Sequence, residues 1–389
     1  MLTPLPPLLP LRLRSTRRRT SRLLTVPILT IPLLAAPLLA CSPKSGPADS
    51  GGAADTSNSG GTCARAPVID IQGAVAGTRE AETSYAVPWT GDDRDFTVHA
   101  WYPTDDESGE AARWLGLIED TGSWVDAALA PADCKAPLVV FSHGSQAWAG
   151  NGAPLMRQFV AAGWIAAAPD HTDNTLTDNT DDRPASYPLL RVLDTRATID
   201  WFENLPEDDP LYDRVDTSRV FVFGHSYGGQ TAWLLSGPDF DPEAIAASCA
   251  GAGGCSDAEV AAFEARSVDP RVVAVGPMAG AAGTNLVAEV GWAAMDRPVL
   301  YLTGSADSDG SVAFDATSEG DVTWVEIEGG CHESFTATEL PCDVDKDLSL
   351  TITATYLTAF GSKAVWGWTG GDAVLDGSEP VDPIATLRR

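Results

Sequence analysis

The chain is poor in cations, and this shortage excludes one broad class of function. Its 389 residues include 25 Lys and Arg against 54 Asp and Glu, which gives a formal net charge of −29 at pH 7. Proteins bind DNA or RNA through positively charged surfaces that release counterions from the phosphates. We therefore expect no nucleic-acid partner. The length and the 44% hydrophobic content also exclude a disordered chain and a small disulfide knot.

Residues 1–40 lack any acidic side chain but contain six arginines. Eighteen uncharged residues, 23–40, follow the arginines. This order is typical of a secretory signal peptide. A membrane-spanning anchor is the alternative, because such a run is just long enough to cross a bilayer. Three prolines spaced five residues apart favour the signal peptide, since each removes a helix hydrogen bond.

The residues Leu38-Leu39-Ala40-Cys41 resemble the lipobox of bacterial lipoproteins. The resemblance implies that residues 1–40 are a lipoprotein signal peptide and that cleavage frees Cys41, whose sulfur carries a lipid. It also implies an exported bacterial protein that its lipid anchors to a membrane, in the periplasm or at the cell surface. Residues 42–62 contain no aromatic residue, Leu, Ile or Val, so we expect 41–66 to be the lipidated cysteine and a flexible linker.

Six cysteines remain beyond Cys41, an even number in a chain that we expect to be exported. Exported proteins form disulfides, so we expect three bridges. The sequence leaves other pairings open, but the short spacings favour Cys249 with Cys255 and Cys331 with Cys342, which leaves Cys63 with Cys134. The chain has no CxxC pair, which argues against the alternative of a zinc site.

From residue 67 onward, short apolar runs alternate with helical stretches, and we expect one domain over 67–389. The expected strands are 96–102, 138–142, 164–168, 220–223, 271–275, 299–302 and 322–327. The expected helices are 153–162, 188–204, 230–236 and 349–359. This alternation predicts a mainly parallel sheet covered by helices on both faces. Residues 237–269 fit no sheet element, and we expect them to form a small helical cap or lid.

Chemistry concentrates at residues 220–229, Val-Phe-Val-Phe-Gly-His-Ser-Tyr-Gly-Gly. Four apolar residues lead into Gly224-x-Ser226-x-Gly228, and a helix-like stretch follows. This is the strand, turn and helix order of a nucleophile elbow. The turn lifts the Ser226 hydroxyl from the sheet edge, and Gly224 and Gly228 leave room where side chains would collide. The helix start also points N–H groups at any anion beside Ser226.

On these residues the chain resembles the α/β-hydrolase superfamily. The nearest groups are the predicted dienelactone hydrolase and platelet-activating-factor acetylhydrolase group and the bacterial polyester hydrolases, which are cutinase-like. The similarity runs through Trp101-Tyr102-Pro103, Phe141-Ser142-His143-Gly144, Ala168-Pro169-Asp170-His171, Asn174-Thr175, the elbow, Pro298-Val299-Leu300 and Gly304-Ser305-Ala306-Asp307 to the His332 segment. Dienelactone hydrolases proper use Cys as nucleophile, and Ser226 stands here instead.

An α/β-hydrolase orders its catalytic triad as Ser, acid and His. His332 is the one histidine after Ser226, and it follows an expected strand and two glycines. Asp307 follows the strand before that one, in the position that matches the family's Gly-x-x-Asp. Asp309 is the rival acid. A carboxylate there would fix the tautomer of the imidazole that accepts the Ser226 proton.

The oxyanion of such a reaction needs two backbone donors. The elbow supplies the N–H of Tyr227, and the resemblance implies that Ser145 supplies the other, with Gly144 letting the chain approach the substrate. His143 then orients its loop, and we expect His225 to point away beneath the elbow. Trp148 and Tyr227 are expected to line the substrate pocket, with a loop anchor as the alternative role of Trp148.

We expect no metal and no cofactor. Asp343, Asp345 and Asp347 alternate as in a calcium loop, but Leu348 replaces the required Gly, which excludes an EF-hand and leaves only a looser surface calcium site open. His171 lies near several acidic residues, yet one histidine among solvated acids is a poor metal site.

The sequence thus predicts an exported serine hydrolase that cleaves carboxylic esters of small molecules or lipids, of the short-chain esterase or acetylhydrolase type. We expect a monomer. The alternatives are a polyester hydrolase or lipase, a serine peptidase, and a non-catalytic surface lipoprotein that keeps the fold. Fold alone does not decide among them, because specificity depends on pocket walls.

The lipobox resemblance gives a first prediction. The mature chain begins at Cys41 and carries acyl groups that move it into the detergent phase of a detergent–water partition. The Cys41→Ser variant stays in the aqueous phase. Mass spectrometry of the mature N-terminus checks this, and an unmodified Cys41 would contradict it.

Overall fold

The computed structural model describes residues 62–265, 268–280, 286–307 and 310–389. The expected signal peptide, Cys41, most of the linker and Asp309 lie outside the described residues. The strands are β1 (Ala76–Ala86), β2 (Asp93–Tyr102), β3 (Ala111–Trp114), β4 (Ile118–Val125), β5 (Ala136–Ser142), β6 (Ile165–Asp170), β7 (Val215–His225), β8 (Val272–Met278), β9 (Val299–Gly304), β10 (Val322–Ile327) and β11 (Ala385–Arg388). The α-helices are α1 (Ala153–Ala161), α2 (Tyr187–Glu203), α3 (Tyr227–Leu235), α4 (Pro242–Gly251), α5 (Asp257–Glu264), α6 (Gly310–Ala316), α7 (Lys346–Trp366) and α8 (Asp372–Leu375), and short 3₁₀ turns include η1 (Ala149–Gly152), η2 (Glu289–Ala294) and η3 (His332–Phe335).

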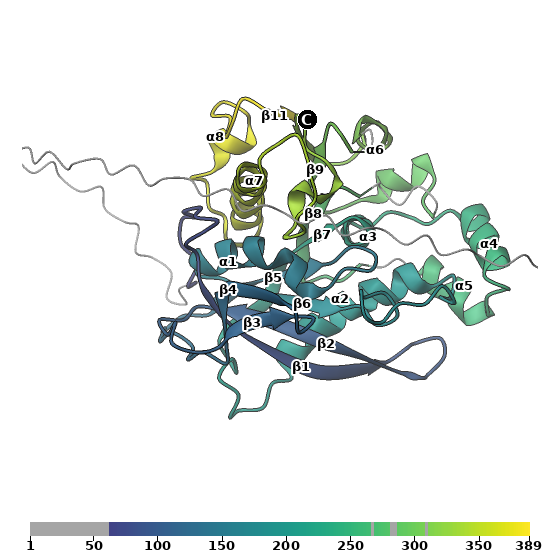
Figure 1. Ribbon diagram of the computed structural model, residues 1–389. Coiled ribbons are helices and arrows are strands. Elements are labelled where there is room, and N and C mark those ends of the chain that lie inside the picture. The colour runs from purple at the N-terminus through teal and green to yellow at the C-terminus, as the bar shows by residue number, and fades with distance from the viewer. Residues whose placement is uncertain (1–61, 266–267, 281–285, 308–309) are drawn as a thin grey trace, which may run out of the picture. The chain divides into compact units, whose positions relative to one another are not determined.

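In the described residues the strands form one sheet in the order β11-β10-β9-β8-β7-β5-β6-β2-β1-β4-β3. The neighbouring strands β6, β5, β7, β8, β9 and β10 pair in parallel. At either side of them, β2 pairs antiparallel with β6, and β11 pairs antiparallel with β10. Helices flank the sheet (Figure 1). The expectation of a mainly parallel sheet between helices is confirmed.

The central strands are buried on both faces because their side chains alternate between two apolar layers. On β5, Val139 and Phe141 join the layer that contains α1 and α7, whereas Leu138 and Val140 join the layer of α2 and α3. Phe141 is fully buried, and burial of such a side chain contributes roughly 1.5–3 kcal/mol. This double burial explains why the strands read as continuous apolar runs in the sequence.

The sequence analysis did not predict β1, β3, β4 and β11, which lie toward the two ends of the sheet. In β1, buried residues give way to alternating half-buried and exposed ones, and the strand carries Arg79, Glu80 and Glu82. Its ten residues from Gly77 to Ala86 are held by antiparallel pairing with β2. Such a strand is fixed by its partner's backbone and has little apolar signal of its own.

Residues 237–269 contain the helices α4 and α5, so the expected helical character is present. Asp241 caps α4, and Ser256 with Glu259 forms a capping box at α5. Ile245 and Phe263 pack with Leu189 of α2 and with Leu286. Whether this segment acts as a lid stays a prediction.

The expected cysteine pairs are all bridged, namely Cys63 with Cys134, Cys249 with Cys255, and Cys331 with Cys342.

Among the described residues, no helix combines the length and the apolar character that a bilayer crossing requires.

Candidate active site

Ser226 lies at the sharp turn between the end of β7 and the start of α3. Its backbone has φ 55° and ψ −116°, a conformation that a serine adopts only when its surroundings enforce it. A Cβ on Gly228 would lie 1.8 Å from the carbonyl oxygen of Ser142, and one on Gly224 would lie 2.2 Å from that of Gly228. Both positions therefore require glycine, and the turn presents a half-buried Ser226 at the edge of the sheet.

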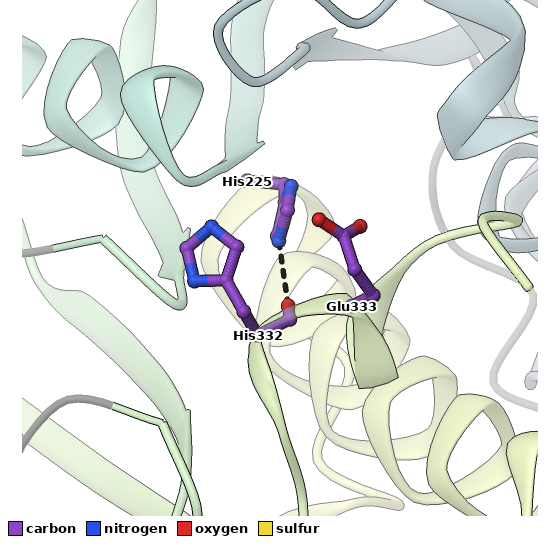
Figure 2. Close-up of side chains that lie close together, drawn as sticks. All are labelled: His225, His332 and Glu333. Carbon is purple, nitrogen blue, oxygen red and sulfur yellow. Dashed lines mark hydrogen bonds between the residues drawn. The ribbon is translucent and has the colours of Figure 1, made fainter. Parts of the chain in front are cut away.

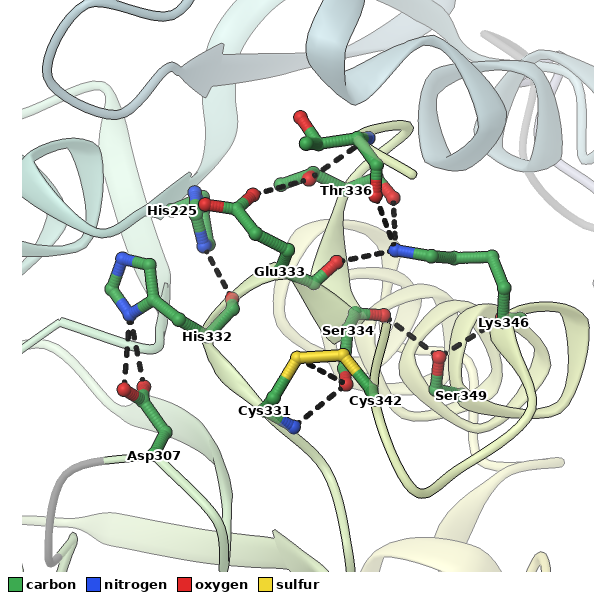
Figure 3. Close-up of a disulfide and its surroundings, with 11 residues drawn as sticks. His225, Asp307, Cys331, His332, Glu333, Ser334, Thr336, Cys342, Lys346 and Ser349 are labelled. Atoms are coloured by element: carbon green, nitrogen blue, oxygen red, sulfur yellow. Dashed lines mark hydrogen bonds and ion pairs between the residues drawn. A yellow bond between two sulfur atoms is a disulfide. The ribbon is translucent and has the colours of Figure 1, made fainter. Parts of the chain in front are cut away.

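His332 and Asp307 face each other at the same sheet edge. Asp307 follows β9 and His332 begins η3 after β10, and these two strands are parallel neighbours. The His332 Nδ1 atom lies 3.1 Å from both carboxylate oxygens of Asp307 (Figure 3). An ionised carboxylate only accepts, so Nδ1 carries the proton and Nε2 keeps its lone pair. The hydrogen bond that His332 donates to Asp307 raises the pKa of His332 above its ordinary 6.5.

His225 connects the elbow to the His332 segment. Its Nε2–H donates to the carbonyl oxygen of His332 over 2.8 Å, and the two rings lie 4.8 Å apart (Figure 2). Burial and the neighbouring His332 lower the pKa of His225 to about 4, so this ring is neutral. The expectation that His225 points away from the site is wrong, because its ring faces the loop that carries the candidate base.

The Ser226 Oγ and His332 Nε2 atoms have no hydrogen-bond partner in the part of the chain that the structure describes. In resting enzymes the bond between nucleophile and base is often long and tightens only in the substrate complex. His225 directly precedes Ser226 and bonds the His332 backbone, so the imidazole is held close to the elbow.

The backbone N–H groups of Ser145 and Tyr227 are held in place near Ser226, because the carbonyl of the same peptide group accepts a hydrogen bond in each case. The Gly144 carbonyl accepts from His143 Nδ1–H at 2.7 Å, and the Ser226 carbonyl accepts from the Gln230 N–H at 3.1 Å. In a trans peptide the C=O and the N–H point in opposite directions. The N–H groups of Ser145 and Tyr227 therefore point away from these bonds, and no described acceptor bonds either of them.

The Gly144 segment contacts the elbow directly, since a Cβ on Gly144 would lie 3.2 Å from the Ser226 Cβ. His143 accepts from the His171 N–H through Nε2, which leaves its proton on Nδ1. Burial holds the pKa of His143 well below 6.5 and keeps the ring neutral. The geometry therefore brings the two expected oxyanion donors to the side of Ser226.

No family model and no curated protein matches this chain. Among solved structures it is similar to the ferulic acid esterase from Streptomyces cinnamoneus, with a TM-score of 0.55, 21% identity, and coverage of 85% of this chain and 100% of that chain. This chain has the α/β-hydrolase fold. At such identity the likeness shows the fold alone and leaves the chemistry to the site.

Trp148 and Tyr227 lie in different surroundings. Trp148 lines a cavity of about 590 Å³ together with Trp114, Ile118 and Leu350, and neither Ser226 nor His332 lines it. Its indole also packs against the core, which favours the alternative role of a loop anchor. The Tyr227 ring lies under the guanidinium of Arg191 at 4.6 Å and beside Tyr187 at 6.1 Å. Substrate contact by either ring stays a prediction.

Among the described residues, His225, His332 and Glu333 form the one group of side chains with ligand atoms close enough to consider a metal ion. These atoms spread over up to 4.8 Å, whereas a tetrahedral zinc ion holds its ligands about 3.3 Å apart. One nitrogen of His225 bonds the His332 carbonyl (Figure 2), and Nδ1 of His332 bonds Asp307 (Figure 3). We therefore assign no metal to this group.

The acidic residues that suggested calcium or another metal have local roles. Asp345 caps α7 by accepting from the Leu348 N–H at 3.0 Å, and Asp347 accepts from Gln72 at 2.8 Å. His171 is fully buried between Asp194 and Ser142, to which its nitrogens bond.

The His332 segment is fastened to α7, a feature that sequence reasoning found only in part. The Lys346 ammonium donates to the carbonyls of Glu333, Thr336 and Thr338 at 2.5–3.2 Å, and Ser349 donates to the Ser334 carbonyl at 2.8 Å (Figure 3). The Cys331–Cys342 bridge closes the same segment one residue before His332. The bridge was expected from spacing, whereas no pattern in the sequence pointed to Lys346.

The bridge gives a prediction. Loop-entropy arithmetic puts its stabilisation at roughly 3 kcal/mol, but the imidazole tolerates less displacement than the core does. Cys331→Ala with Cys342→Ala lowers the turnover number and the melting temperature while the protein stays folded. Cys249→Ala with Cys255→Ala, which opens another short loop, is the control and lowers only the melting temperature. Equal turnover in the two double variants would contradict the bracing role.

The histidine pKa values give another prediction, which proton NMR can check. His332 titrates above pH 6.5, whereas His171 and His225 titrate near pH 4 because burial disfavours their charged forms. Between pH 6.5 and about 4 the unfolded chain binds more protons at these two rings and at the buried His143, whose pKa also lies well below 6.5. Their contribution to the free energy of unfolding is therefore lost as the pH falls. The smaller contribution of His332, whose side chain is 42% exposed, is lost as the pH rises through its raised pKa. Denaturant titrations across this range measure the sum.

Proposed function

We propose that this protein is an exported serine hydrolase that cleaves carboxylic esters through an acyl-enzyme. The observation that carries the proposal is the strained backbone of Ser226 between β7 and α3. Beside it lie two N–H groups that no described acceptor bonds and an imidazole that Asp307 orients. Each of these features is costly or improbable alone, and a nucleophilic hydrolase needs all of them.

In this mechanism the Ser226 Oγ attacks the ester carbonyl carbon while its proton passes to His332 Nε2. The N–H groups of Ser145 and Tyr227 stabilise the negative charge on the carbonyl oxygen. The imidazolium, held by Asp307, then gives the proton to the departing alcohol. Water repeats the sequence on the acyl-enzyme and restores Ser226. No cofactor takes part in these steps.

For the substrate we propose short-chain carboxylic esters of small molecules or lipids, as in the acetylhydrolase-type groups that the sequence resembles. The similar solved structure is named a ferulic acid esterase, so esters of aromatic acids belong in the substrate panel. Polyester hydrolysis and peptide hydrolysis are the alternatives on the same fold. We also propose that the protein acts outside the cytoplasm on a lipid anchor at Cys41, a setting with which the three disulfides are compatible.

Labelling with a fluorophosphonate probe tests the nucleophile, and a panel of p-nitrophenyl esters of rising chain length tests the substrate class. We expect one label per chain, on Ser226, and rates that fall as the acyl chain lengthens. A chain that neither takes the label nor hydrolyses any ester is the non-catalytic lipoprotein.

The triad gives a further prediction. Ser226→Ala and His332→Ala each abolish nearly all esterase activity, and the double variant loses little more, because triad members act as one unit. Asp307→Asn lowers the turnover number by about 10⁴ because the imidazole takes the wrong tautomer. Steady-state kinetics measure these losses. If the losses of the single variants multiply in the double variant, or if Asp309→Asn is the damaging change, the assignment is wrong.

A further inference from the structure

Arg191 of α2 is fully buried, and its hydrogen bonds go to neutral groups. Its Nη1 donates to the Asn174 side-chain oxygen at 2.9 Å, its Nη2 to the His143 carbonyl and to Ser142 Oγ, and its Nε to Thr231 Oγ1 at 3.3 Å. No carboxylate forms an ion pair with it in the described residues. A buried cation without a direct counter-ion is costly, so its retention points to a use.

The nearest acid on the same helix is already engaged. Asp194 accepts from Arg94 at 2.8 and 3.0 Å, from His171 Nδ1–H at 2.8 Å, and from the Tyr85 hydroxyl at 2.8 Å. These bonds, and above all the one from His171, hold the pKa of Asp194 far below its ordinary range despite its burial. The positive charge of Arg191 is thus not cancelled by a hydrogen bond to this carboxylate.

Arg191 contacts both segments that carry the proposed oxyanion donors. On one side, it holds the His143 carbonyl and Asn174, and Asn174 in turn donates to Ser145 Oγ at 3.0 Å and accepts from the Gln146 N–H at 3.1 Å. The loop that carries the Ser145 N–H is therefore connected to the guanidinium at two points, through the His143 carbonyl and through Asn174.

On the other side, the guanidinium lies over the Tyr227 ring at 4.6 Å. It also bonds Thr231, whose hydroxyl donates to the Tyr227 carbonyl at 3.2 Å. The first turn of α3, which carries the Tyr227 N–H, is therefore fixed by the same group. A planar guanidinium can hold several acceptors and an aromatic face at once, which an ammonium cannot.

We propose that Arg191 is a positioning residue that holds the two halves of the oxyanion hole in register and adds positive potential beneath it. This inference rests on the proposed function, because it needs an oxyanion beside Ser226. Preorganised donors aimed at a developing charge are worth most in a dry site, and a small displacement of one of them is expensive.

The test compares Arg191→Lys and Arg191→Met with a matched control, Arg94→Lys. Arg94 is also a buried arginine of this polar cluster, but in the described residues it bonds Asp194 and the Thr172 carbonyl, pairs with Asp173 at 3.5 Å, and forms no hydrogen bond or ion pair with either donor segment. The readouts are the second-order rate of fluorophosphonate labelling of Ser226 and the kcat and KM for a p-nitrophenyl ester. Circular dichroism fixes a temperature at which all variants are folded.

We expect both Arg191 variants to label at least about tenfold more slowly than Arg94→Lys, with kcat and kcat/KM falling together and KM little changed. Equal labelling rates in the Arg191 variants and the control would overturn the proposal, because destabilisation alone would then explain the effect. A wild-type protein that takes no label refutes the proposed function instead, so the two failures are distinguishable.

If the Arg191 variants do not fold, Asn174→Ala decides. It removes the side-chain link from Arg191 through Asn174 to Ser145, and it leaves the cation and its bond to the His143 carbonyl in place. A labelling rate about tenfold below wild type, at an unchanged folded fraction, supports the proposal. A wild-type labelling rate overturns it.

Discussion

The close packing of the elbow against the end of β5 is the constraint on which the site depends. The Ser142 carbonyl occupies the space that a Cβ of Gly228 would need, so α3 starts in contact with the neighbouring strand. That contact forces Ser226 into its strained conformation and sets the Tyr227 N–H beside the Gly144 loop. The twofold burial of the central sheet supplies the rigidity that holds the strain in place.

Around this contact the polar groups form a single directional set of hydrogen bonds. Arginine only donates and an ionised carboxylate only accepts. The partners of the buried His171 and His143 rings therefore decide which ring nitrogen carries the proton. His171 carries its proton on Nδ1 toward Asp194, and His143 carries its own on Nδ1 toward Gly144. The buried imidazoles are neutral because desolvation disfavours their charge, and each therefore both donates and accepts. The result is a rigid polar layer beneath a half-exposed site.

The candidate base is held differently. His332 lies on a loop after β10, and its position depends on connections to other elements: the ring of His225, the ammonium of Lys346, and the Cys331–Cys342 bridge. His332 is therefore held by two sets of hydrogen bonds and a disulfide, whereas Ser226 is held by the strand β7 that directly precedes it. This division suits the proposed chemistry, in which the nucleophile must stay fixed while the imidazole moves a proton between two partners.

The sequence by itself determined the fold class and the elbow, because each has a local signature: buried strands appear as apolar runs, and Gly-x-Ser-x-Gly follows such a run. For the cysteines, the short spacings favoured the observed pairing but left other pairings open. Chain order selected His332, whereas Asp307 was expected from its match to the family's Gly-x-x-Asp, with Asp309 as the rival. The strands β1 and β4 near one end of the sheet, the orientation of His225 and the contacts of Lys346 and Arg191 were decided only by the tertiary structure. These features rest on partners far away in the chain, and a lone arginine or an alternating polar strand carries no local sign of what it will contact.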